Sequence, residues 1–217
     1  MTGDGSDIVV MKFGGTSVAG AEQIKRAAGR IVAAREAGNR VVAVLSARGK
    51  TTDELVDAAH EISERPVARE MDMLLSTGER ISCALCAMAI HDMGHEAISL
   101  TGSQAGIVTD SSHTKARIID VRADRISEAL MQDRIVLVAG FQGVSTDSRD
   151  VTRLAWSGLS HRLGAATCCS SSAISTRLRS GSMTASIELK ALSSSASATA
   201  KSGPATMIHS TWTPYLG

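Results

Sequence analysis

The stretch Ile8-Val9-Val10-Met11-Lys12-Phe13-Gly14-Gly15-Thr16-Ser17-Val18 decides the fold of this 217-residue chain. Its first four residues are apolar and mostly β-branched, which predicts a buried strand. Two glycines follow and a helical pattern begins by Ala21, so we expect a strand, a tight turn and a helix. Glycine lets backbone approach a ligand closely, and N–H groups at a turn can bind an anion. With Lys12 at the strand end, the turn suits a phosphate or carboxylate; an ordinary turn with a surface lysine is the alternative.

The composition excludes several classes of protein. A hydrophobic content of 43% supports a sizeable core, and an aromatic content of 2% means that this core is aliphatic. The net charge of +1 gives no argument for a nucleic acid or membrane partner, and no apolar stretch reaches the length of a membrane span. The first residues are acidic and glycine-rich, unlike a signal peptide, so we expect a cytoplasmic protein. The four cysteines form two close pairs, which is not a disulfide framework.

Helical and strand patterns alternate along the chain. Apolar residues between 22 and 37 recur at helical spacing, and Gly38-Asn39 then predicts a helix end. The alternation predicts an α/β fold with a mostly parallel sheet and right-handed crossovers. The predicted elements after the first strand are helix 22–37, strand 40–45, helix 69–92, strand 96–100, helix 120–131 and strand 135–139.

A polar loop from Ser46 to Glu54 follows the second strand. Its Gly49-Lys50-Thr51 triplet is typical of a P-loop, but Val44 stands where a P-loop requires glycine, so that interpretation fails. A polar loop at the carboxyl end of a strand is nevertheless where open α/β sheets bind ligands. Thr52 can also cap a helix that starts near Asp53, and the two roles are compatible.

The long helical pattern 69–92 is interrupted by Gly78-Glu79-Arg80. Glycine within a helix costs about 1 kcal/mol, so Gly78 indicates a kink or a close contact. Glu79 would then lie beside irregular backbone, with a solvated surface glutamate as the alternative. Cys83-x-x-Cys86 on this helix is interpreted as packing, because no second pair at zinc spacing lies in the body of the chain. The predicted apolar stripe consists of Met71, Leu74, Leu75, Gly78, Ile81, Leu85 and Met88.

Two further loops follow strands. Residues 101–106 carry turn chemistry, and a glycine loop at 140–144 follows the strand 135–139. The histidines occur singly, so we interpret them as surface or loop residues and not as metal ligands: His60, His91, His95 and His113.

Taken together, these stretches resemble the aspartate kinases of the amino-acid kinase family, in their actinobacterial form. The resemblance runs nearly without gaps from about Ile8 to Thr152. It implies that residues 1–152 form the N-terminal part of a three-layer α/β/α sandwich with a mostly parallel central sheet, incomplete at its C-terminal end. The segments that carry it are 12–18, 46–55, 69–82, 101–107 and 138–144.

The resemblance implies an activity and a set of site residues. The reaction is the ATP-dependent phosphorylation, with Mg2+, of the L-aspartate side chain to 4-phospho-L-aspartate, the first step toward lysine, threonine and methionine. Lys12 would hold phosphoryl oxygens and Glu79 would accept the substrate's ammonium group. The resemblance implies no nucleic acid or membrane partner. It implies a homo-oligomer or an association with a regulatory subunit. The implied cofactor contacts come from Lys12, Phe13, Gly14, Gly15 and Ser46, and the substrate contacts from Lys50, Thr51, Thr52, Asp53, Glu54 and Glu79.

The resemblance stops after Thr152. Where the family continues Thr-Leu-Gly-Arg-Gly-Gly-Ser-Asp-Thr-Thr, this chain has other residues from Arg153 on, with Trp156 in place of an arginine that grips substrate carboxylate. The tail, residues 153–217, is rich in Ser, Thr and Ala with weak periodicity, which predicts disorder. A reading-frame shift near codon 152 would explain the change; a genuine divergent C-terminus and a basic tail for an acidic partner are the alternatives. No regulatory ACT domain is visible.

The lost motif has two predicted consequences. Phosphoryl transfer depends on several positive contacts, so we expect little or no kinase activity from this chain. A non-catalytic relative that folds in part, or that binds another subunit, is therefore the alternative function, and a kinase for glutamate is a more distant one. The missing half also predicts a sheet with an uncovered edge and face, exposed to aggregation or partner binding.

Overall fold

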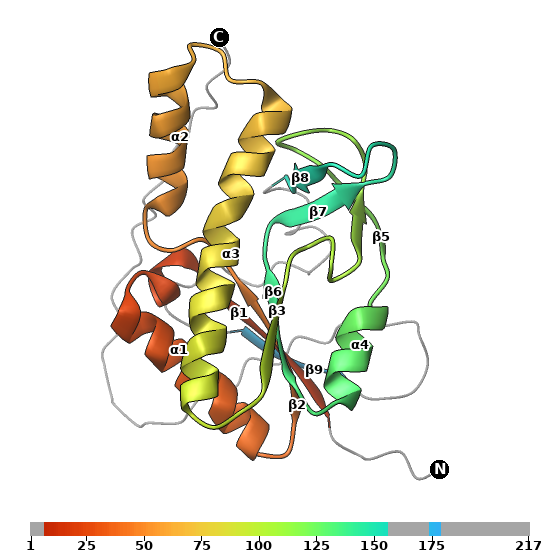
Figure 1. The fold of residues 1–217 in the computed structure, drawn as a ribbon. Coiled ribbons are helices and arrows are strands. Elements are labelled where there is room, and N and C mark those ends of the chain that lie inside the picture. Colours follow the sequence, from red (N-terminus) through yellow and green to blue (C-terminus); the bar gives the residue numbers. More distant parts are fainter. Residues whose placement is uncertain (1–6, 156–173, 179–217) are drawn as a thin grey trace, which may run out of the picture.

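The computed structural model describes residues 7–155 and the backbone of residues 174–178, and a five-stranded sheet lies at its centre (Figure 1). The strand order is β3-β6-β2-β1-β9, and every pair is parallel except β1 with β9. The predicted mostly parallel sheet is confirmed. Its strands are β1 (Ile8–Phe13), β2 (Arg40–Leu45), β3 (Ala97–Leu100), β6 (Ile135–Ala139) and β9 (Ile174–Leu178).

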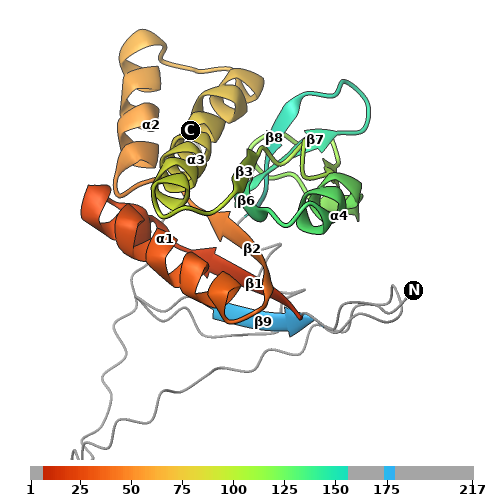
Figure 2. The same ribbon diagram turned by 60° about the horizontal axis from the view of Figure 1, so that its bottom comes forward.

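Helices cover both faces of this sheet, which confirms the three-layer sandwich (Figure 2). On one face, α1 (Ala21–Glu36) and α3 (Ala68–Asp92) share a buried cluster with β1, β2 and β6. On the other face, α4 (Asp124–Met131) packs through Leu130. The predicted stop of α1 is also confirmed, since Gly38 has a φ of 87°, a left-handed conformation that glycine adopts without strain.

A second, four-stranded sheet lies beside the N-terminal half of α3 and has the order β5-β4-β7-β8 (Figure 1). The sequence analysis did not predict it, because three- and four-residue strands carry too little periodicity to be recognised. The predicted glycine loop 140–144 is in fact a turn at Gly140 and Phe141 followed by β7. The strands are β4 (Ile107–Thr109), β5 (Ile118–Val121), β7 (Gln142–Ser145) and β8 (Val151–Arg153).

The predicted start of helix 120–131 is wrong. Residues 118–121 form β5, which pairs antiparallel with β4, and α4 begins at Asp124. Val121, expected to point inward, is 52% exposed. Pairing with the preceding strand β4 overrode the local helical period at this end.

The helix α3 is continuous through Gly78, so the predicted interruption is wrong, while the predicted close contact is confirmed. A Cβ built on Gly78 would lie 2.8 Å from the Cβ of Ala47, in the loop after β2. Only a residue without a side chain lets helix and loop approach this closely.

The predicted stripe of α3 is also displaced around the helix. Ile81 and Met88 are 44% and 61% exposed. Small and polar residues occupy the buried face instead, because α3 lies close to its neighbours along most of its length. The buried residues are Asp72, Leu75, Ser76, Gly78, Glu79, Ser82, Cys83, Cys86, Ala87 and Ile90.

The expectation that no apolar stretch reaches the length of a membrane span is wrong for α3. By length and composition alone this 25-residue helix could cross a membrane, since one 18-residue window in it has a mean hydropathy of 1.3. Half of the window is buried inside the protein, as in the core helix of a globular domain.

The edge of the parallel sheet at β1 is paired, contrary to the expectation of a bare edge. The backbone of β9, from within the tail, forms an antiparallel pair with β1 from Ile8 to Lys12. Arg153, the first residue of the tail, is likewise the last residue of β8. The other features predicted for the tail, including disorder, lie outside the described residues.

We expect Gly78→Ala to destabilise the protein although alanine is the better helix former. The added methyl group would overlap Ala47, and overpacking of this kind costs about 1 to 3 kcal/mol, more than the gain of about 1 kcal/mol in helix propensity. Gly29→Ala in α1 is the matched control, since its Cβ would meet no atom within 4 Å. Urea denaturation midpoints should fall for Gly78→Ala and rise for Gly29→Ala; a rise for both would contradict the contact.

Candidate active site

Three turns meet at the carboxyl ends of the central strands. The amide of Ser46 donates to the carbonyl of Phe13 at 3.0 Å, and the amide of Gly140 donates to the carbonyl of Leu45 at 2.9 Å. These bonds connect the ends of β1, β2 and β6 in the order of the sheet. Ligands of open α/β sheets bind at such an edge.

Ala47 is enclosed between the first turn and α3. A Cβ on Gly15 would lie 2.8 Å from the carbonyl oxygen of Ala47, and a Cβ on Gly78 would lie 2.8 Å from its methyl group. The amide of Gly49 also donates to the carbonyl of Gly15 at 3.0 Å. We call Gly15, Ala47 and Gly78 the Ala47 interlock. It joins the Lys12–Gly15 turn, the Ser46–Lys50 loop and the middle of α3.

Lys12 lies at this edge, with its Nζ 5.9 Å from the centre of the Phe141 ring. Cation–π attraction of this kind holds an ammonium group over a ring and leaves donors for another partner. Gly14 has open space around its Cα, so the backbone there is accessible. Phe13 as a whole is 2% exposed, its side chain belongs to the core, and its carbonyl accepts the amide of Ser46.

The predicted aspartate-binding residues from Lys50 to Glu54 lie at the start of α2 (Thr51–Ile62). Lys50 is the N-cap of this helix, and its side chain makes no capping hydrogen bond. The predicted capping by Thr52 is therefore wrong. Thr51 is next to the interlock, because its Cγ2 would lie 3.6 Å from a Cβ on Gly78. Thr52 is half-buried, whereas Lys50 is exposed.

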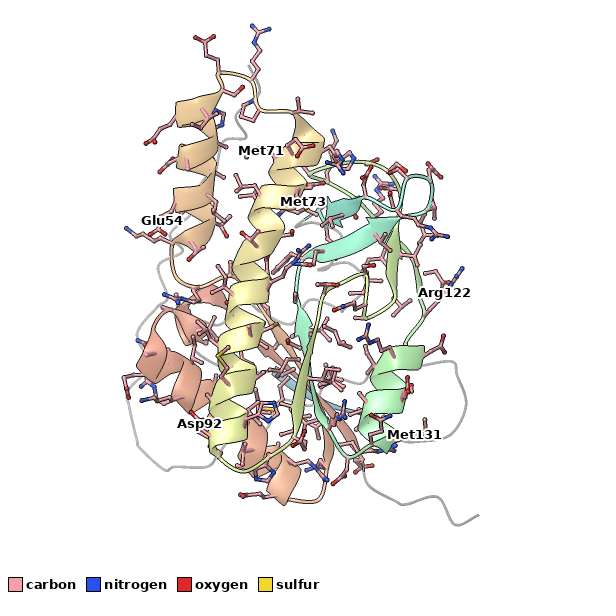
Figure 3. The ribbon with its side chains drawn as sticks, in the orientation of Figure 1. Glu54, Met71, Met73, Asp92, Arg122 and Met131 are labelled. Carbon is pink, nitrogen blue, oxygen red and sulfur yellow. The ribbon has the colours of Figure 1, made fainter. Side chains whose placement is uncertain are left out.

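Asp53 and Glu54 are also exposed, and Figure 3 shows Glu54 on the side of α2 away from α3. Their carboxylates favour the start of the helix through its dipole. The structure thus brings Thr51 to the interlock but turns Glu54 away from it.

Glu79 is the most deeply buried of the predicted site residues, at 1% exposure. The solvated alternative is therefore excluded. Arg153 Nη1 donates to Glu79 Oε1 at 3.3 Å and to Oε2 at 3.5 Å. Burial raises the pKa of Glu79 above its ordinary value, while the neighbouring guanidinium groups of Arg153 and Arg80 act in the opposite direction.

Glu79 is the last of four α3 residues that form polar contacts with the small sheet and its loops. Asp72, fully buried, accepts hydrogen bonds from the ring of His113 at 2.9 Å and from the amide of Thr114 at 3.0 Å. We call these contacts the polar seam. Its helix positions recur every three or four residues, as one helix face requires. Its pairs are Arg69 with Asp150, Asp72 with His113 and Thr114, Ser76 with Gln142, and Glu79 with Arg153.

Two arginines beside the interlock were missed by the sequence analysis. The Nε atoms of Arg48 and Arg80 are buried and have no hydrogen-bond partner among the described residues. Buried donors without partners are rare in native proteins, so they fit an anionic ligand at this edge. Their signal in the sequence was proximity alone: Arg48 follows Ala47 and Arg80 follows Glu79.

The buried cysteines confirm packing as their role. Cys83 and Cys86 are 1% and 0% exposed, and both belong to the core cluster of α1, α3 and the sheet. Burial raises the pKa of each thiol to about 12. Within residues 7–155, no group of three or more His, Cys, Asp or Glu side chains could hold a metal ion.

Comparison with known sequences identifies the lineage. The sequence pattern described as the amino acid kinase family matches residues 7–173, more than half of the chain. The chain belongs to the amino acid kinase family. The match continues beyond Thr152, where the motif resemblance ends.

Relatives within the amino acid kinase family are named aspartokinases. The aspartokinase of Mycolicibacterium smegmatis is 58% identical over 151 residues, covering 70% of this chain and 36% of that protein. The aspartokinase of Corynebacterium efficiens is 54% identical over 168 residues, covering 74% of this chain and 40% of that protein. The predicted resemblance to aspartate kinases is confirmed, and the chain spans well under half the length of these relatives.

Solved structures agree with the fold. The aspartate kinase from Synechocystis matches with a TM-score of 0.58 and 44% identity, over 70% of this chain and 25% of that one. Aspartokinase III of E. coli, in complex with aspartate and ADP, matches with a TM-score of 0.54 over 70% of this chain and 44% of that one. At 21% identity the second match bears on the fold alone.

We expect Cys83 and Cys86 to resist alkylation in the folded protein. With a pKa of about 12, each thiol is about one part in ten thousand thiolate at pH 8, and the thiolate is the reactive form. Iodoacetamide labelling followed by peptide mass spectrometry should find both unmodified until denaturant is added. Rapid labelling of either cysteine in the folded protein would contradict a core position.

Proposed function

We propose that this chain carries part of an aspartate kinase site, centred on the Ala47 interlock. The reaction is the transfer of the ATP γ-phosphoryl group to the side-chain carboxylate of L-aspartate, giving 4-phospho-L-aspartate for the synthesis of lysine, threonine and methionine. The observation that carries this proposal is the interlock itself, because it joins the Lys12–Gly15 turn, the Ser46–Lys50 loop and the middle of α3 at one edge. The identity to proteins named aspartokinase supports it.

In this proposal the first turn and the Ser46 loop hold the nucleotide phosphates. Lys12 supplies a charge beside phosphoryl oxygens, and the open backbone at Gly14 lets them approach, while Gly15 packs against Ala47. Ser46 lies at the same edge, where its amide donates to the carbonyl of Phe13. Arg48 and Arg80, whose buried Nε atoms have no partner among the described residues, would provide further positive charge. Mg2+ usually keeps its phosphate ligands and few protein ones, so it would accompany ATP and neutralise the transferred group.

Aspartate would bind on the α2 and α3 side of the interlock. Thr51 begins α2 beside Gly78, and Lys50, Thr52, Asp53 and Glu54 are its neighbours in the sequence. Glu79 would accept the ammonium group of the substrate through a charge-assisted hydrogen bond.

The transfer itself needs positioning more than covalent catalysis. An oxygen of the aspartate side chain attacks the γ-phosphorus, the bond from phosphorus to the ADP oxygen breaks, and ADP leaves with that electron pair. No intermediate on the protein is required. What the chain contributes is alignment of the two substrates and neutralisation of negative charge.

A non-catalytic relative is the second candidate function, and one contact favours it. The carboxylate of Glu79, which the reaction assigns to substrate, is already paired with Arg153. Trp156 also stands where the resembling family has an arginine that grips carboxylate. Under either candidate we propose a cytoplasmic protein that acts as a homo-oligomer or with a regulatory subunit.

We expect the purified 217-residue chain to release ADP in response to L-aspartate at a rate at least about a hundredfold below that of a full-length relative. The loss follows from the absent arginine and the occupied Glu79. A coupled ADP assay measures it, with the Mycolicibacterium smegmatis aspartokinase assayed in parallel as the positive control. A rate comparable to that of this relative would contradict the predicted loss of activity and favour a fully active aspartate kinase.

Nucleotide binding tests the first turn separately from turnover. Lys12→Ala should weaken ATP binding about tenfold or more in calorimetry, since one charge-assisted contact is lost. Lys25→Ala is the matched control, because Lys25 is a solvent-exposed lysine of α1 paired only with Glu22 in the structure described. Equal affinities of the two variants for ATP would show that Lys12 does not contribute to nucleotide binding.

A further inference from the structure

The buried carboxylate of Glu79 has a cation of its own chain as its partner. Arg153 reaches it from β8, 74 residues later in the sequence, and the two side chains are 16% and 2% exposed. Both carboxylate oxygens lie within 3.5 Å of the same guanidinium nitrogen. The contact is thus a largely buried ion pair between the middle of α3 and the end of the small sheet.

The backbone around Arg153 holds this pair in place. Arg153 is opposite Gln142 in the β7–β8 ladder, and its carbonyl accepts the amide of Ala116 at 2.9 Å. The side chain of Gln142 in turn donates to the carbonyl of Ser76, one turn before Glu79. The strand that carries the guanidinium and the helix that carries the carboxylate are therefore joined on both sides of the ion pair.

Electrostatics gives the pair its importance. A carboxylate removed from water needs a cation or must take up a proton. Arg80 acts on Glu79 through space, and among the described side chains only Arg153 is within hydrogen-bond distance of its carboxylate. Cys83 lies one helical turn further along α3, and burial raises the pKa of its thiol to about 12. Without Arg153, the strongest partner of this carboxylate would have to come from outside.

We propose that Arg153 occupies the place at Glu79 where the ammonium group of an amino-acid substrate would bind, so that the chain excludes L-aspartate until this guanidinium is removed. The inference rests on the proposed function, which assigns Glu79 to that ammonium group. It makes Arg153 a specificity-determining residue. A neutral residue at position 153 opens a site for a small ammonium cation.

Four variants test the pair. Arg153→Thr removes the charge, Arg153→Met removes it while keeping bulk in β8, and Arg153→Lys keeps a cation. Arg122→Thr is the matched control, an arginine that is 72% exposed on the side of the small sheet away from α3 (Figure 3). The pKa of Glu79, followed by carboxyl NMR, should rise in the Thr and Met variants of Arg153 and stay unchanged in Arg153→Lys and Arg122→Thr.

Binding then separates this inference from the proposed function. L-aspartate should bind Arg153→Thr and Arg153→Met about tenfold or more tightly than the parent chain, Arg153→Lys or Arg122→Thr. Methylammonium chloride, a probe with no carboxylate, should lower the pKa of Glu79 in the same two variants. If the parent chain binds L-aspartate as tightly as Arg153→Thr, the inference is overturned and the proposed function stands.

The remaining outcomes are also decisive. If Arg153→Thr and Arg153→Met bind methylammonium at Glu79 but not L-aspartate, the inference stands and the proposed substrate is wrong. If neither L-aspartate nor methylammonium changes the pKa of Glu79 in either variant, Arg153 is a structural partner only and the inference fails.

Discussion

The contact between Ala47 and two glycines is the constraint on which the candidate site depends. At the positions of Gly15 and Gly78, an added Cβ would lie 2.8 Å from Ala47, so a larger residue at either position would force the neighbouring atoms to move. The loop after β2 is therefore held between the first turn and the long helix, and none of the three can shift alone. A site made from loops and a helix requires positions fixed within a fraction of an ångström, and close packing of backbone provides this without large side chains.

The interlock lies between two chemically different parts of α3. Beyond the interlock, Cys83, Cys86 and Ile90 pack on the parallel sheet, where burial of apolar area stabilises the fold. From Arg69 to Glu79, the polar seam faces the small sheet. Buried polar pairs add little net stability, because desolvation offsets their attraction, but each has a single satisfactory partner geometry. The polar seam therefore determines the position of the small sheet against α3 and adds little to the stability of the fold.

The sequence predicted the parts of this fold that depend on local patterns. The strands of the parallel sheet, α1 and the extent of α3 follow from periodicity and helix stops, and the tight turn with Lys12 follows from its glycines. What it missed depends on distant partners. The start of α4 was lost to pairing of β5 with β4, and the buried face of α3 was misplaced because polar residues take their partners from segments 40 or more residues away. No local sequence pattern pointed to Arg153 as a site residue, because its proposed role depends on its contact with Glu79, which lies 74 residues earlier.

Burial of Glu79 links the fold to the question of activity. A carboxylate at 1% exposure is costly to maintain without a counter-ion, and the structure provides the carboxylate through α3, which is fixed by the interlock. The counter-ion comes from β8, immediately after the point where the motif resemblance ends. A buried charge of this kind suits a substrate cation or one half of a closed internal pair, and in the described structure Arg153 makes it the second. The ancestry of the chain is that of the amino acid kinase family, and the partner of its buried carboxylate is supplied from position 153.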